Sequence, residues 1–345
     1  MTTGPTTARD SPDWLIRPFE ASRLAPAWLG LGVAIAWTLV LGLVHMVADA
    51  RLGPMEDPFG WTVVVDGAFV GVLLAGHAHL HLRAVSDLHE LAPILPGGPT
   101  ELARLSYDVP NLSTPIRWLA TILGAAGGVH IALHDATHTE RYSHFAQSDP
   151  RYIAFVVQNV IFGAVSSRLG AAEIHMTRAY ARLGERVEVD LLDLSKLRVF
   201  ARKGLRSVLV WVLVSSTLSL FWVIGSAGQA NVGMVFLMLG LVLLALVAPT
   251  LGVHRSIATA KAAELAVLAG AIRSERASTL APMRADAPEN ARLGNLIAYQ
   301  AFVRSIREWP FDLSIVSRST LLILLGAGSW LGGALVERLL DLLLD

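Results

Sequence analysis

The feature that most constrains this chain is a series of apolar stretches, each about as long as a membrane is thick. A membrane helix needs about 20 mainly apolar residues, because the hydrocarbon core is ~30 Å thick and each helical residue rises ~1.5 Å. Seven stretches qualify, and they comprise residues 26–47, 61–80, 116–133, 153–168, 207–224, 232–253 and 315–336. We therefore predict an all-α, polytopic membrane protein with seven transmembrane helices.

The composition supports a protein that is solvated by lipid. Hydrophobic residues make up 53% of the 345 residues and charged residues only 16%, whereas soluble domains carry roughly 25% charged residues. The 28 Lys and Arg residues equal the 28 Asp and Glu residues, so nucleic acid is not an expected partner. The chain has no cysteine, which excludes disulfides and thiolate metal sites. We therefore expect the protein to be embedded in a lipid bilayer.

The basic residues predict the orientation. Segments 1–25, 82–117, 168–206 and 254–318 hold 24 of the 28 Lys and Arg residues. Because basic residues are retained on the cytoplasmic side, we expect these four segments inside the cell, with the N-terminus cytoplasmic and Asp345 outside. The expected location is the plasma membrane.

Several inside segments continue the helices of the spans. Apolar or small side chains recur every three or four residues beyond the fourth span and form one helical stripe, with Leu169, Ala172, Met176, Tyr180, Leu183 and Val187. We expect this helix to end near Gly184, a similar extension of the sixth span beyond Val253, and a separate helix at 290–309 that Pro310 ends. Such stripes need partners in water, so we predict a cytoplasmic helical bundle.

The chain is thereby divided into six parts. These are a cytoplasmic arm (1–25), spans one to four (26–167), a cytoplasmic helical extension (168–206), spans five and six (207–253), a segment of the cytoplasmic bundle (254–312), and span seven with the C-terminus (313–345).

Polar residues inside the predicted spans are candidates for a site. Asp66 lies within the second span, and Gln158 and Asn159 lie within the fourth. Ionisable groups at such depth usually face a cavity or a partner. Asp66, Gln158 and Asn159 therefore line an outward-facing pocket with His130 and His134, or they form hydrogen bonds between helices.

Histidines give an alternative that involves a metal. His134, His138 and His144 lie near the outer end of the third span, where they could bind one zinc ion. His77, His79 and His81 fall at the opposite end of their span, ~30 Å away, so the two groups cannot share a metal pair. Without zinc, we expect no cofactor.

Small residues mark places where helices approach closely. GxxxG spacings begin at Gly67, Gly124 and Gly328. In the seventh span, one face carries Ser319, Ile323, Gly326, Ser329 and Gly333. This face suits a pore wall or a tight subunit contact, and packing within one subunit is the alternative. No Walker loop, GxSxG elbow or HExxH motif is present, so we do not expect an enzyme.

The order and length of these segments resemble the insect odorant and gustatory receptor fold. That family has seven spans, an inside N-terminus and helices prolonged into a cytoplasmic anchor. The resemblance implies a homotetrameric cation channel whose last span lines the pore, and it adds Trp61 and Trp222 to Asp66 as candidates near an outer ligand cavity. It rests on architecture, because the stretch from Thr320 to Trp330 does not reproduce the family's Thr-Tyr and Gln-Phe pattern.

Three functions follow from these patterns. The first is an oligomeric membrane channel or ligand-gated receptor-channel whose ligand the sequence does not name. The second is a metal-dependent membrane enzyme or metal transporter that uses the outer histidines. The third is a non-conducting membrane scaffold that binds a protein partner.

Because the chain lacks cysteine, single introduced cysteines can test the orientation directly. In intact cells, we expect Glu140→Cys to react with a membrane-impermeant maleimide, and Arg178→Cys and Lys261→Cys to react only after permeabilisation. The opposite labelling pattern would invert the predicted orientation.

Overall fold

The computed structural model describes residues 13–52, 59–138, 150–224, 240, 242–280, 288–310, 317, 320 and 321. Every regular element in these ranges is helical, which agrees with the predicted all-α class. The α-helices are α1 (Arg17–Ala21), α2 (Pro26–Leu52), α3 (Phe59–Leu91), α4 (Gly98–Asp108), α5 (Thr114–His138), α7 (Pro150–Gly184), α8 (Arg198–Ile224), α10 (Leu251–Leu280) and α11 (Pro288–Ser305). Short 3-10 turns are η1 (Ala92–Ile94), η2 (Ser195–Leu197) and η3 (Ala248–Thr250).

Six helical segments are long and apolar enough to cross a membrane. They are Pro26–Arg51, Thr62–Ile94, Thr114–Leu133, Pro150–Gly184, Ser195–Leu220 and Val242–Arg276. They overlap the first six predicted spans, the sixth of which is described only from residue 242 onward, apart from residue 240. The seventh prediction, at 315–336, lies almost entirely outside the described residues.

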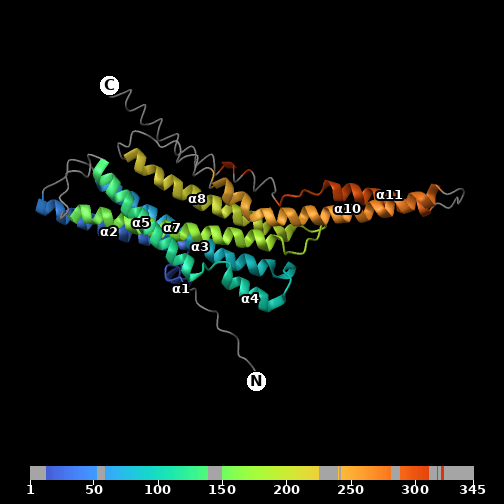
Figure 1. Ribbon diagram of the computed structural model, residues 1–345, viewed down its shortest axis with the longest axis horizontal. Helices are drawn as coiled ribbons and strands as arrows, with labels where there is room; N and C mark the ends of the chain where they lie inside the picture. The colour runs from blue at the N-terminus through green and yellow to red at the C-terminus, as the bar shows by residue number, and fades with distance from the viewer. Residues whose placement is uncertain are drawn as a thin grey trace, which may run out of the picture.

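The helices run roughly along one long axis, and α10 and α11 form a hairpin that extends beyond the others (Figure 1). Helix α7 ends at Gly184, as predicted, and is 35 residues long, well above the ~20 that a span requires. Helix α3 continues past the predicted end near Leu80 to Leu91. The extra turns bury Ala84, Leu88 and Leu91 completely, so packing continues after the run of high hydropathy has stopped.

Ion pairs between distant segments gather at one end of the bundle, which we call the charged end. It is defined by the pairs Asp87–Arg206, Glu90–Arg202, Glu101–Arg186, Glu185–Arg255 and Lys261–Glu308. Parts of 82–117, 168–206 and 254–318, which the sequence places on the same side of the membrane, therefore meet there. Asp49 and Arg151, which the sequence places on the opposite side, pair with each other at 2.9 Å.

The largest buried apolar cluster also lies toward the charged end. It joins Leu88 of α3, Met176 and Tyr180 of α7, Phe200 of α8 and Ile257 of α10, each of which is fully buried. The predicted stripe of α7 is thus a core face. Apolar side chains on the outside of α2 and α5, such as Leu39 and Leu123, remain more than half exposed, as expected for surfaces that lipid covers.

Two short segments outside the membrane-length helices pack against those helices. In the N-terminal arm, Ile16, which precedes α1, and Phe19 of α1 pack against Ala78 of α3 and are buried. Helix α11 ends at Ser305, four residues before Trp309. The chain turns there because α10 holds it: Lys261 Nζ donates to the Ile306 carbonyl at 2.8 Å, and the His254 ring stacks on Trp309 at 4.1 Å.

Glycines set the distance between α5 and α7. A Cβ added at Gly124 would collide with the backbone of Gly163, and one added at Gly128 would collide with the backbone of Asn159. The predicted GxxxG spacing at Gly124 is therefore a real helix contact. On the same helix, a Cβ at Gly127 would meet nothing within 4 Å.

This difference predicts the effect of adding a single methyl group. Gly124→Ala should lower the free energy of unfolding by about 1–3 kcal/mol, because the two backbones must separate. Gly127→Ala is the matched control and should be neutral or slightly stabilising. Thermal unfolding in detergent measures both changes, and equal melting temperatures for the two variants would show that α5 and α7 do not pack as described.

Candidate functional site

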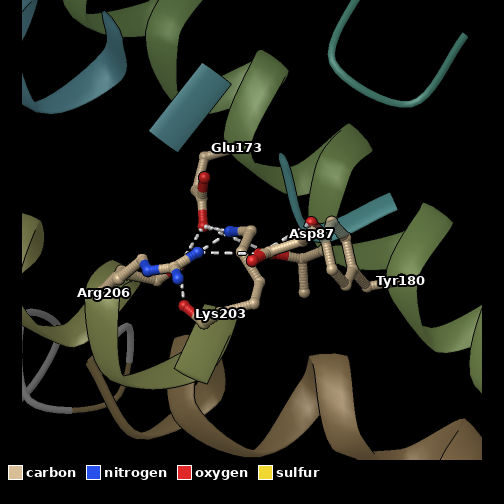
Figure 2. A network of polar contacts seen from close by, with 7 residues as sticks. Asp87, Glu173, Tyr180, Lys203 and Arg206 are labelled. Atoms are coloured by element: carbon tan, nitrogen blue, oxygen red, sulfur yellow. Dashed lines mark hydrogen bonds and ion pairs between the residues drawn. The ribbon is translucent and has the colours of Figure 1, made fainter. Parts of the chain in front are cut away.

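A cluster of buried polar side chains joins α3, α7 and α8 near the charged end (Figure 2). Asp87 comes from α3, Glu173 and Tyr180 from α7, and Lys203 and Arg206 from α8. All except Arg206 are buried, and Lys203 is only 1% exposed. Charged side chains are almost never buried to this extent unless they are paired, so this polar cluster is the first candidate for a site.

The Glu173–Lys203 pair links α7 to α8. Lys203 Nζ donates to Glu173 Oε1 at 2.6 Å and to Ser207 Oγ at 2.7 Å. Ser207 Oγ donates to the same Glu173 oxygen at 2.6 Å. One carboxylate oxygen thus receives two short hydrogen bonds from α8, which offset part of the cost of removing both charges from water.

The Asp87–Arg206 pair links α3 to α8. Arg206 Nη1 donates to Asp87 Oδ2 at 2.7 Å, and the Tyr180 hydroxyl of α7 donates to the same oxygen at 3.1 Å. Lys203 Nζ lies 5.9 Å from the centre of the Tyr180 ring, within the range of a cation–π contact. The polar cluster therefore contains two carboxylates and two cations and is balanced in charge.

The N-terminal arm is held by two further polar contacts. Arg168 of α7 donates to Asp13 at 2.5 Å, and this pair is buried. His81 Nε2 lies 3.2 Å from Glu20 Oε1. These contacts connect the arm to α7 and α3, and they place His81 in a structural contact of the arm.

A cavity of about 220 Å³ lies beside the polar cluster, between α3, α7 and α8. Its wall is mostly apolar and includes Leu73, Leu169 and Val214. Glu173 belongs both to this wall and to the polar cluster. A mostly apolar cavity with a few polar groups is the usual form of a small-molecule site.

The structure brings together some of the residues that the sequence predicts for an outer pocket. Asp66 is 4% exposed, and its side chain lies close to that of Gln158. Asn159 donates to the Phe155 carbonyl of its own helix at 2.9 Å. His130 is exposed on α5. None of these four residues lines the cavity between α3, α7 and α8.

The other predicted site residues lie outside the part of the chain that the structure describes. This applies to the side chains of Trp61, His134, His138 and Trp222, and to His144, Ser319, Ile323, Gly326, Ser329 and Gly333. Among the described side chains, no group of three or more His, Asp or Glu residues is arranged to hold a metal ion.

The sequence analysis missed the polar cluster. Asp87 and Glu173 lie a few residues after a strongly apolar run and Lys203 a few residues before one, where charged residues normally meet water. One signal was available: Glu173 lies next to Ala172, a member of the predicted apolar stripe of α7. A charge beside a core face indicates that a partner is needed on the neighbouring helix.

Comparisons with known proteins return nothing for this chain. No protein-family model, no curated protein and no solved structure matches it.

The Glu173–Lys203 pair predicts a non-additive pair of substitutions. Glu173→Met or Lys203→Met alone should lower the free energy of unfolding by about 3–5 kcal/mol, because each leaves a buried charge without its partner. The double variant should recover most of that loss. Denaturant unfolding in detergent measures the cycle.

Glu185 and Arg255 provide the control, since both side chains of this pair are about half exposed or more. Glu185→Met should cost less than about 1 kcal/mol. If the free energy of unfolding of the Glu173–Lys203 double variant falls by the sum of the two single losses, the buried pair does not exist as described.

Proposed function

We propose that the protein is an oligomeric channel of the plasma membrane, gated by a ligand or by another stimulus, that conducts cations through a central pore. Six membrane-length helices support the membrane part of the proposal. In this proposal the charged end faces the cytoplasm, as the distribution of Lys and Arg favours.

The observation that carries the proposal is the α10–α11 hairpin. It extends beyond the other helices (Figure 1) and carries charged residues such as Arg273, Arg276 and Arg304, which suits water. Even so, Val267 is 68% exposed, Ile297 50% and Phe302 46%. Apolar side chains on a hairpin in water favour burial against another surface.

We assign that surface to a second copy of the same chain. On α10, the exposed residues Ala262, Ala263, Ala266, Val267 and Gly270 recur at helical spacing and form one small, apolar face. Small residues let two helices approach closely. Closed symmetry would then produce a homo-oligomer, and a homotetramer is the form that the resemblance favours.

The hairpin also supports the predicted position of the pore. The chain leaves α11 at Ser305 and leads directly to residues 313–345, which contain the predicted seventh span. If subunits meet through the hairpin, the segment that follows it is brought toward the shared axis. The proposed pore face is Ser319, Ile323, Gly326, Ser329 and Gly333.

The proposal predicts an effect of Phe302 on assembly. Phe302→Asp should shift the protein in nanodiscs from an oligomer to a monomer, because it puts a charge into the apolar contact. Asn295→Asp adds the same charge at an exposed polar position of α11 and should leave the oligomer intact. Native mass spectrometry measures the subunit number.

Conduction is tested on the same preparations. The oligomer should give unitary cation currents in planar bilayers, and the Phe302→Asp monomer should give none. A wild-type protein that is monomeric, or an oligomer that stays silent under all stimuli, contradicts the channel.

A further inference from the structure

The cavity between α3, α7 and α8 contains a polar atom without a partner. Glu173 is 5% exposed, and its Oε1 atom accepts hydrogen bonds from Lys203, Ser207 and Thr177. Its Oε2 atom is buried, and no group in the described part of the chain donates to it. A buried acceptor in this state is costly, so it calls for a donor from elsewhere.

The position of Glu173 limits where that donor can come from. Glu173 lines the cavity, and Oε1 is held on the side of Lys203, toward α8 (Figure 2). An ionised carboxylate only accepts hydrogen bonds, so the missing group must carry an N–H or O–H. The cavity is the space from which such a group can approach.

The other residues of the cavity wall indicate the polarity of the remaining part of the ligand. Besides Glu173, the wall has two polar side chains, His77 and Ser166. Most of the remainder is apolar, and it includes Phe69 and Leu73 from α3, Leu169 from α7, and Val214 and Leu218 from α8. Water needs two to four polar partners, and away from Glu173, His77 and Ser166 this wall offers few, so water does not fill the whole cavity favourably. The occupant is therefore mostly apolar, with its donor at one end.

Charge balance distinguishes between possible donors. The Glu173 carboxylate is already neutralised by Lys203 at 2.6 Å. A ligand with an ammonium group would bring an additional positive charge into a buried site, and an uncompensated buried charge is costly. A neutral hydroxyl group supplies the hydrogen bond without adding charge.

The volume of the cavity limits the size of the ligand. A dry cavity of about 150 Å³ holds a molecule the size of benzene. At about 220 Å³, this cavity has room for roughly ten non-hydrogen atoms.

We infer that the cavity between α3, α7 and α8 binds a small apolar alcohol or phenol whose hydroxyl group donates to Oε2 of Glu173. The inference does not depend on conduction, and binding is measured without any current.

The probes are 4-propylphenol and 4-propyltoluene, which differ only in a hydroxyl in place of a methyl group. Equilibrium dialysis against protein in nanodiscs, with partitioning into empty nanodiscs subtracted, gives the saturable binding. For the wild type we expect one 4-propylphenol per chain, bound at least about tenfold more tightly than 4-propyltoluene. Equal affinities, or no saturable component, would overturn the inference.

Two variants locate the binding. Val214→Phe fills the cavity without touching the polar cluster and should weaken 4-propylphenol binding at least about tenfold. Leu213→Phe is the matched control, because the neighbouring Leu213 is 47% exposed and does not line the cavity; its affinity should be unchanged. Equal effects of the two variants would place the binding elsewhere.

The double variant Glu173→Met with Lys203→Met tests the hydrogen bond while keeping the site free of unpaired charge. In this variant the preference for the phenol over the toluene should fall close to one, because the acceptor is gone. A preference that stays at the wild-type ratio would show that the hydroxyl group does not contact Glu173.

Discussion

Buried charge is the constraint on which this bundle depends. Hydrocarbon offers no hydrogen bonds, so helices satisfy their own backbones, and each ionised side chain needs a partner within the protein. The pair Glu173–Lys203 joins α7 to α8, Asp87–Arg206 joins α3 to α8, and Asp13–Arg168 joins the N-terminal arm to α7. Each of these pairs requires its two segments to meet in one register. We therefore attribute the relative positions of these helices to the polar contacts more than to the apolar ones.

Much of the fold could be predicted from local patterns. Run lengths of high hydropathy located the first six membrane-length helices, because span length is set by membrane thickness. The three-and-four spacing of Leu169, Met176 and Tyr180 correctly identified a buried face of α7, since helical periodicity depends only on neighbouring residues. The distribution of Lys and Arg assigned several segments to the same side of the membrane, and parts of these segments meet at the charged end. The contact between Glu185 and Arg255 is one example.

The site could not be predicted in the same way, because its geometry depends on contacts between distant residues. Glu173 and Lys203 are 30 positions apart, and Asp87 and Tyr180 are 93 apart. In the sequence, each looks like an ordinary charge beside a span. Asp66 was a candidate because it interrupts an apolar run, but it does not line the cavity. The cavity wall consists mostly of apolar residues from three helices, and nothing in the sequence distinguishes them from other apolar residues. Only the packing of α3, α7 and α8 shows that one of these charges borders an apolar space.

Glu173 gives the cavity a physical connection to the rest of the bundle. An occupant that donates to Oε2 would change the electron density that the carboxylate offers to Lys203 and Ser207, which link α7 to α8. Helix α7 in turn meets α10 through close backbone contact at Gly184 and Gly252, where a Cβ would not fit. A ligand can shift such an assembly only by as much as it prefers one arrangement over another. A change at Glu173 that displaced α7 would therefore act on a helix in close backbone contact with α10, which leads into the α10–α11 hairpin.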